Sequence, residues 1–165
     1  MNWYIKIAQD KKLILIRGIS GTGKSSLAES LAPASQIFAT DDFFMVNGEY
    51  KFDTDMLSKA HLWNQSRVRR AMVADISPIV VPNTSAKFWE MKAYVSLAKA
   101  HGYDIEFAEP NWHPGLKTPE GKWNVDFLSG KNTHNVDKKT LQEMADKYEH
   151  GPSIDKVLQS KAPWE

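Results

Sequence analysis

Eight residues near the beginning of the chain constrain its fold more than any other segment. Gly18 to Ser25 reads GISGTGKS and fits the pattern G-x-x-x-x-G-K-[ST] at every position. The apolar run Leu13 to Ile16 comes just before it and is typical of a strand buried on both faces. Residues 25–32 follow with a helical pattern that stops at Pro33. A strand, a glycine-rich turn and a helix in this order predict an α/β fold.

The residue types in this turn suit a bound anion. Glycines let the backbone curl so that its N–H groups point inward, and the helix that follows presents its positive end to the same place. Lys24 can reach the β- and γ-phosphates of a nucleotide, and the Ser25 hydroxyl can ligate Mg²⁺. We therefore expect ATP or GTP and Mg²⁺ as cofactors, with the nucleotide held by Gly21, Thr22, Gly23, Lys24, Ser25 and Ser26.

The rest of the sequence alternates short apolar runs with helical patterns. Such alternation implies a mainly parallel central sheet flanked by helices. Beyond the run at 13–16, strands are predicted at residues 4–8, 36–40, 78–81 and 103–108, and long helices at 53–74 and 86–100. After a loop at 110–122, residues 127–150 are predicted to be mostly helical, and 154–158 form a short amphipathic segment.

Composition narrows the classes of function. A length of 165 residues suits one domain spanning 1–165. The absence of cysteine excludes a disulfide framework, a thiolate zinc site and a cysteine nucleophile, and the histidines lack the spacing of zinc ligands. A net charge of +1 leaves any nucleic-acid contact to a local patch. Neither a signal peptide nor a membrane-spanning run is recognisable, so we expect a cytoplasmic protein with no membrane contact and no obligate protein partner.

The phosphate-binding motif leaves several reaction classes open, and the sequence narrows them. No Asn-Lys-x-Asp or Asp-x-x-Gly motif of a switch GTPase is present, and the chain is too short for a motor ATPase. A small phosphotransferase remains. Asp41 and Asp42 follow the predicted strand 36–40, and carboxyl ends of parallel strands line the ligand crevice. One of the two acids is expected to face an acceptor hydroxyl while the other braces the loop; alternatively both are turn or cap residues.

An ordered set of segments across residues 13–160 resembles the P-loop polynucleotide 5′-hydroxyl kinase family. The resemblance is closest to the kinase module of large ubiquitin-ligase-binding proteins and more distant to phage polynucleotide kinases. It rests on the glycine-rich motif followed by Thr40 to Phe44, Ala60 to Gln65, Ile76 to Ile79, Pro82 to Thr84, Trp89 to Lys92, Glu109-Pro110 and Tyr148 to His150.

The resemblance implies a fold, an activity and residue roles. It implies a three-layer P-loop NTPase fold, similar to adenylate kinase, with a small helical lid at about 124–149. The implied activity is transfer of the ATP γ-phosphate to the 5′-hydroxyl of DNA or RNA. In that activity Lys24 clamps phosphate, Ser25 ligates Mg²⁺, Asp41 is the general base and Lys131 supplies positive charge from the lid. Asn83 and Thr84 align with a segment near the substrate.

Three departures from the family pattern keep other activities open. Pro82 stands where the family has an aspartate near the metal, so the chain either does without that carboxylate or takes one from elsewhere, with Asp42 as the candidate second metal ligand. Gly130 and Lys131 replace paired arginines, and lysine lacks their bidentate fork. Phe44 replaces an arginine of the phage enzymes. The alternatives are a kinase for another alcohol, such as a modified DNA base, a nucleoside or a small molecule, and a catalytically weak nucleotide-binding module.

Residues near the acid pair are candidates for binding the acceptor. Besides Asp41, Asn83 and Thr84, they are Phe44, Trp63, Arg67 and Arg70. The arginines, with Arg69, would contact acceptor phosphates or form a solvated helix face. The aromatic rings would stack on a base or belong to the core. The loop at 110–122 mixes Trp112 with lysines, which suits either a strand-binding rim or the cover of a sheet edge.

Overall fold

A three-stranded parallel sheet forms the centre of the molecule. In a computed structural model that describes residues 10–131 and 136–165, the strand order is β4-β1-β5. The strands are β1 (Lys12–Ile16), β4 (Ile79–Pro82) and β5 (Asp104–Ala108). Leu13 lies opposite Ile79 on one side and Ile105 on the other. This confirms the predicted parallel sheet for the three strands, whereas the strand predicted at 4–8 lies outside the described residues.

Helices cover both faces of the sheet, so Leu13 to Ile16 are buried throughout. Leu13 and Leu15 pack on the side of α3 (Leu57–Val73), α4 (Lys92–His101) and α7 (Ile154–Gln159). Ile14 and Ile16 pack against Ala28 of α2 (Lys24–Leu31) on the opposite side. The side chains of a strand alternate between its faces, so one apolar run supplies both cores. The three-layer α/β architecture is confirmed.

The strand predicted at 36–40 is wrong. Only Ile37 bridges to Val80 of β4, and the Phe38 N–H donates to the Val80 carbonyl at 2.8 Å. Short 3₁₀ helices at Ala34–Gln36 and Thr40–Phe44 enclose this contact. The chain therefore runs beside β4 as an extended edge without forming a ladder, and it still delivers Asp41 to the carboxyl end of the sheet.

Other boundaries differ from the prediction at the ends of elements. The helices predicted at 53–74 and 86–100 begin as 3₁₀ turns, at Thr54–Met56 and Phe88–Met91, before α3 and α4. A small hairpin of β2 (Met45–Val46) and β3 (Glu49–Tyr50) was not predicted, because two-residue strands leave too little periodicity. The loop after β5 holds one 3₁₀ turn, Pro114–Leu116.

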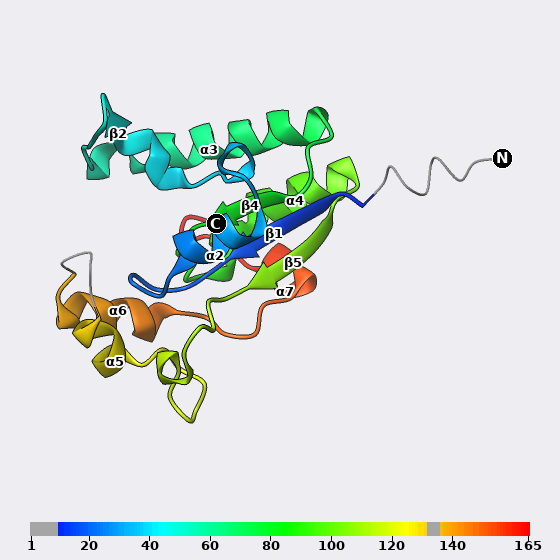
Figure 1. The fold of residues 1–165 in the computed structure, drawn as a ribbon. Helices are drawn as coiled ribbons and strands as arrows, with labels where there is room; N and C mark the ends of the chain where they lie inside the picture. Colours follow the sequence, from blue (N-terminus) through cyan, green and yellow to red (C-terminus); the bar gives the residue numbers. More distant parts are fainter. Residues whose placement is uncertain (1–9, 132–135) are drawn as a thin grey trace.

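The predicted lid contains two helices rather than one long one. They are α5 (Val125–Gly130) and α6 (Lys138–Lys147), and residues 132–135 between them are outside the described part. The lid helices share a hydrophobic cluster with the glycine-rich turn and the loop after β5, formed by Ile19, Leu116, Trp123, Val125, Leu128, Leu141 and Tyr148. Figure 1 shows the lid and the β2–β3 hairpin on opposite sides of the sheet end that leads into α2. No helix within 10–131 and 136–165 is long and apolar enough to span a bilayer.

Candidate active site

The glycine-rich turn between β1 and α2 is held in a curl by its own side chains and by its neighbours. Gly21 and Gly23 have φ angles of 82° and 95°, which favour glycine. A Cβ on Gly18 would lie 2.5 Å from the Thr22 Oγ1 atom. The buried Thr22 hydroxyl donates to the Ile19 carbonyl at 2.9 Å. The conformation of the turn is therefore held by its own glycines and by the Thr22 side chain.

Lys24 lies over this turn. Its Nζ donates to the Gly18 and Ile19 carbonyls at 2.8 and 3.1 Å. Burial lowers the pKa of Lys24 to about 8, and the negative charge of Asp41 opposes that shift. The ammonium thus occupies the mouth of the turn, where a phosphate would lie within its reach.

The first turn of α2 leaves its backbone N–H groups available. Gly23 is the N-cap residue, and within the described chain no side chain caps the helix or adds an acidic charge to its first turn. Ser25 and Ser26 are exposed there. Free amides, a helix dipole and nearby hydroxyl groups form the arrangement that binds phosphate.

Asp41 faces this phosphate site from the 3₁₀ helix Thr40–Phe44. Its carboxylate is exposed, and its charge acts on both Lys24 and His61. Burial lowers the pKa of His61, and Asp41 opposes that shift. The Tyr50 hydroxyl donates to Asp41 Oδ1 at 3.3 Å. An exposed carboxylate within electrostatic reach of the phosphate-site lysine can accept a proton from an incoming alcohol.

Asp42 is oriented differently. Its Oδ2 atom lies 3.1 Å from Arg67 Nη2, and Arg67 also donates to the Ala39 carbonyl at 3.0 Å. Asp42 therefore braces the segment that carries Asp41. The expectation that Asp42 is a metal ligand stays a prediction, and the structure shows its carboxylate paired with a guanidinium.

The groups at the phosphate site fit a Mg²⁺ ion held mainly by a nucleotide. The Ser25 hydroxyl stands at the first turn of α2 beside Lys24. Pro82 ends β4 opposite Ile16 and supplies no carboxylate. Among the described residues no group of three or more His, Cys, Asp or Glu side chains could hold a metal alone. Mg²⁺ commonly takes one or two protein oxygens and completes its shell with phosphate and water oxygens, so Ser25 suffices as the protein anchor.

Asn83 and Thr84 join the site to the sheet. Asn83 Oδ1 accepts from the Thr40 N–H at 3.1 Å, and its Nδ2 donates to Thr40 Oγ1 at 3.0 Å. The Thr84 carbonyl accepts from the Gly18 N–H at 3.3 Å. These contacts tie the end of β4 to both the Asp41 segment and the glycine-rich turn, so the two residues position the groups that would meet substrate.

The structure does not bring all predicted acceptor residues to the site. Phe44 is only 2 % exposed and packs among Phe43, Tyr50 and Phe52, so its ring belongs to the core beneath the hairpin. The Arg67 guanidinium lies 3.9 Å from the ring centre of the half-buried Trp63, and the guanidinium covers one face of that ring.

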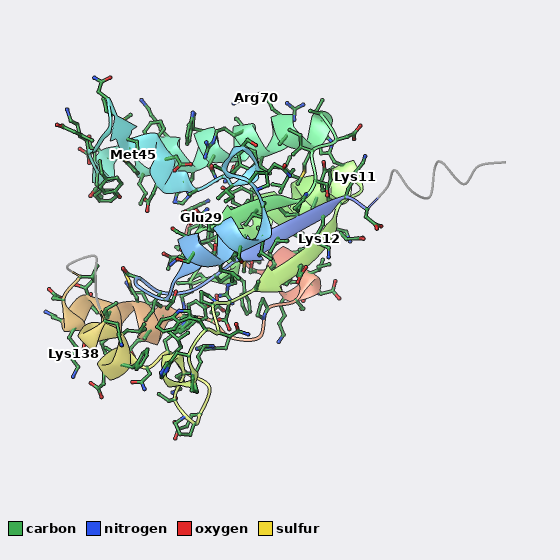
Figure 2. The ribbon with its side chains drawn as sticks, viewed as in Figure 1. Lys11, Lys12, Glu29, Met45, Arg70 and Lys138 are labelled. Carbon is green, nitrogen blue, oxygen red and sulfur yellow. The ribbon has the colours of Figure 1, made fainter. Side chains whose placement is uncertain are left out.

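Arg70 also lies away from the site. It is exposed in the last turn of α3, and Figure 2 shows it on the outer side of that helix. The helix leads from the hairpin back to the beginning of β4, and Arg70 lies near the end of the helix that precedes β4. The structure therefore places Arg70 in a solvated position on the helix, and its role as an acceptor contact stays a prediction.

Lys131 ends α5 and is exposed. Its Nζ lies 5.9 Å from the centre of the Phe127 ring. No contact between the described residues joins Lys131 to the glycine-rich turn. Its predicted role in neutralising phosphate charge remains a prediction that depends on movement of the lid.

Two residues of the site were missed as such by sequence reasoning. Arg17 is fully buried beneath the turn, where it donates to the Ser85, Ala86 and Glu149 carbonyls and stacks on Tyr148 at 4.4 Å. Burial lowers the pKa of Arg17, and the charges of Tyr148 and nearby glutamates oppose that shift. The sequence did carry a signal for Arg17, because this charged residue directly follows the buried apolar run Leu13 to Ile16. The other is Trp112, whose Nε1 donates to the Thr22 carbonyl at 2.9 Å.

Comparisons with known proteins agree with this geometry. A domain-family model described as an AAA domain matches residues 13–114, which is more than half of the chain. The chain is 39 % identical over 154 residues to NEDD4-binding protein 2 of Homo sapiens. The match covers 92 % of this chain and only 8 % of that much longer protein. The chain therefore belongs to this AAA-domain family and is a kinase-like P-loop module that binds nucleotide.

Proposed function

We propose that the protein is an ATP-dependent kinase that phosphorylates the 5′-hydroxyl of DNA or RNA. The observation that carries the proposal is the exposed Asp41 carboxylate, which faces the phosphate-site lysine across the turn. The family resemblance in the Thr40 to Phe44 segment supports a polynucleotide as acceptor.

The transfer is a single in-line displacement. Asp41 accepts the proton of the 5′-hydroxyl while the oxygen of that hydroxyl forms a bond to the γ-phosphorus. The bond between that phosphorus and the β–γ bridging oxygen breaks, and the electron pair leaves on the nucleoside diphosphate. Lys24 and the amides of residues 21–25 stabilise the charge on the phosphates. Mg²⁺ held on Ser25 supplies further charge neutralisation when bound.

Transfer of label from γ-labelled ATP to a 5′-hydroxyl oligonucleotide tests this proposal. We expect Asp41→Asn to lower the transfer rate by at least ~100-fold, because the amide cannot take the proton. Binding of ATP should stay near the wild-type value. Asp55→Asn is the matched control, since Asp55 is an exposed acid of the neighbouring segment and should leave transfer unchanged. Full transfer by Asp41→Asn, or loss of ATP binding, would contradict the assigned role.

A second candidate keeps the kinase chemistry and changes the acceptor to a nucleoside or another alcohol. The burial of Phe44 favours it, because this position offers no positive charge to an acceptor phosphate. Competition between a 5′-hydroxyl oligonucleotide and the matching free nucleoside separates the two. If the oligonucleotide does not compete, the smaller acceptor is favoured. Tight ATP binding without product from either acceptor would instead indicate a binding module.

A further inference from the structure

The loop after β5 holds an indole ring against the phosphate-binding turn. Trp112 Nε1 donates to the Thr22 carbonyl at 2.9 Å. A Cβ built on Gly23 would lie 3.0 Å from Nε1 and 3.4 Å from Cδ1 of the same ring. A Cβ at position 23 would be unusually tight against the ring, so the glycine favours this close approach. The ring is thereby fixed in place and yet remains 56 % exposed.

A cleft of about 410 Å³ opens beside this ring. It runs between the first two turns of α2 and the loop after β5, and it is lined by Gly23, Ser26, Leu27, Ser30, Pro110, Asn111 and Trp112. Its volume falls in the range of small-molecule sites. Because Gly23 lines the cleft and also belongs to the phosphate-binding turn, the cleft directly borders that turn.

We propose that this cleft binds the nucleobase of the phosphate donor, with the base stacked on Trp112. The inference rests on nucleotide binding by the glycine-rich turn and adds the part of the ligand that phosphates do not define. A planar aromatic base gains from stacking on an indole, and the apolar parts of Leu27 and Pro110 extend the surface. Phe127 and His113 pack against Trp112, with ring centres 6.1 and 5.7 Å away, and support the ring from the lid side.

The polar groups of the cleft do not favour one purine over the other. Within the described chain, the Ser26 hydroxyl and the Asn111 amide make no hydrogen bond, and each can both donate and accept. Adenine and guanine present opposite donor and acceptor patterns on their edges, and either pattern can be matched by rotating these groups. The cleft therefore selects donors by stacking area, so purine nucleotides bind more tightly than pyrimidine nucleotides.

Binding of Mg²⁺ complexes of ATP, GTP, CTP and inorganic tripolyphosphate, measured by calorimetry, tests this site. We expect ATP and GTP to bind wild-type protein within a few-fold of each other and more tightly than CTP. Trp112→Ala should weaken the binding of ATP and GTP by roughly tenfold or more. The affinity for tripolyphosphate should stay within about threefold of the wild-type value. Trp112→Phe keeps a ring without the N–H donor and should retain most of the purine affinity. Trp164→Ala, at an exposed tryptophan near the carboxyl terminus, is the control and should change nothing.

Each of the following results would contradict a specific part of the proposed base site. If Trp112→Ala weakens ATP and tripolyphosphate equally, Trp112 only braces the turn, and the stacking site is wrong. Unchanged ATP affinity in Trp112→Ala would place the base elsewhere. A strong preference for ATP over GTP would contradict selection by stacking area. If wild-type protein binds ATP and tripolyphosphate equally well, no base site exists. If it binds neither, the phosphate site and the proposed kinase function fail together.

Discussion

The charge of Lys24 depends on what fills the turn beneath it. In the free protein, burial lowers its pKa to about 8, and two backbone carbonyls supply its contacts. A bound triphosphate adds several negative charges within reach and raises that pKa again. A group whose pKa rises on binding takes up a proton, so ATP affinity is highest below pH 8 and declines as the pH passes that value.

We expect the affinity for ATP to fall by up to about tenfold between pH 7 and pH 9, because near pH 9 only a minority of free Lys24 remains protonated. Calorimetry in two buffers of different ionisation enthalpy measures the proton uptake directly at pH 8.5. Lys24→Met is the control, since it has no group to titrate and should bind weakly without proton uptake. An affinity that stays constant up to pH 9 would show that Lys24 is fully charged in the free protein.

At the scale of elements, the glycine-rich turn depends on Arg17 beneath it. The Arg17 guanidinium joins its own segment, which follows β1, to two others. It donates to the Ser85 and Ala86 carbonyls after β4 and to the Glu149 carbonyl after α6. Its Nη1 atom has no hydrogen-bond partner among the described residues. Removing the side chain would leave buried carbonyls without donors and open a gap beside Phe88 and Tyr148.

Arg17→Ala should therefore lower the free energy of unfolding by roughly 3 kcal/mol, as expected when several buried acceptors lose their donor. Urea denaturation followed by circular dichroism measures this change. Lys12→Ala offers a matched control at the first residue of β1, because among the described residues the Lys12 side chain forms only an exposed ion pair with Glu106 at 3.4 Å. That control should cost less than about 1 kcal/mol. Equal losses in the two variants would refute the bracing role of Arg17.

The elements also show which parts of the structure could be predicted from the sequence. The turn between β1 and α2 was predictable because strand, glycines, lysine and serine occupy consecutive positions, and local chemistry decides their conformation. The strand predicted at 36–40 was wrong, because the apolar residues there pack against the sheet without forming a continuous ladder of hydrogen bonds. Ile37 makes an isolated bridge to Val80. The partners of Asp42 and Trp112, which are Arg67 and Thr22, are distant in sequence and meet only in the folded chain, so these roles could not be derived from spacing.

At the scale of the whole molecule, the main sheet cluster and the lid cluster have different sizes. The larger one joins the sheet to α3, α4 and α7, whereas the lid cluster joins α5 and α6 to Ile19 and Tyr148. Leu141 is the one buried residue of α6, while α4 buries Tyr94, Val95 and Ala98. A small cluster with few buried side chains opens at lower free energy than the main core, so the lid and the sheet are expected to behave as separate cooperative units.

Native-state hydrogen exchange on two matched core truncations tests that separation. Leu141→Ala should speed amide exchange in α5 and α6 by more than tenfold, because it removes the residue that anchors α6, and should leave exchange in α4 unchanged. Val95→Ala in α4 truncates an equally buried residue of the sheet core and should speed exchange in both regions, since the lid cannot stay folded without the sheet. If Leu141→Ala accelerates α4 as much as α6, the two clusters unfold together. A lid that opens by itself would give Lys131 and Phe127 the freedom to approach a nucleotide while β1 and the glycine-rich turn stay in place.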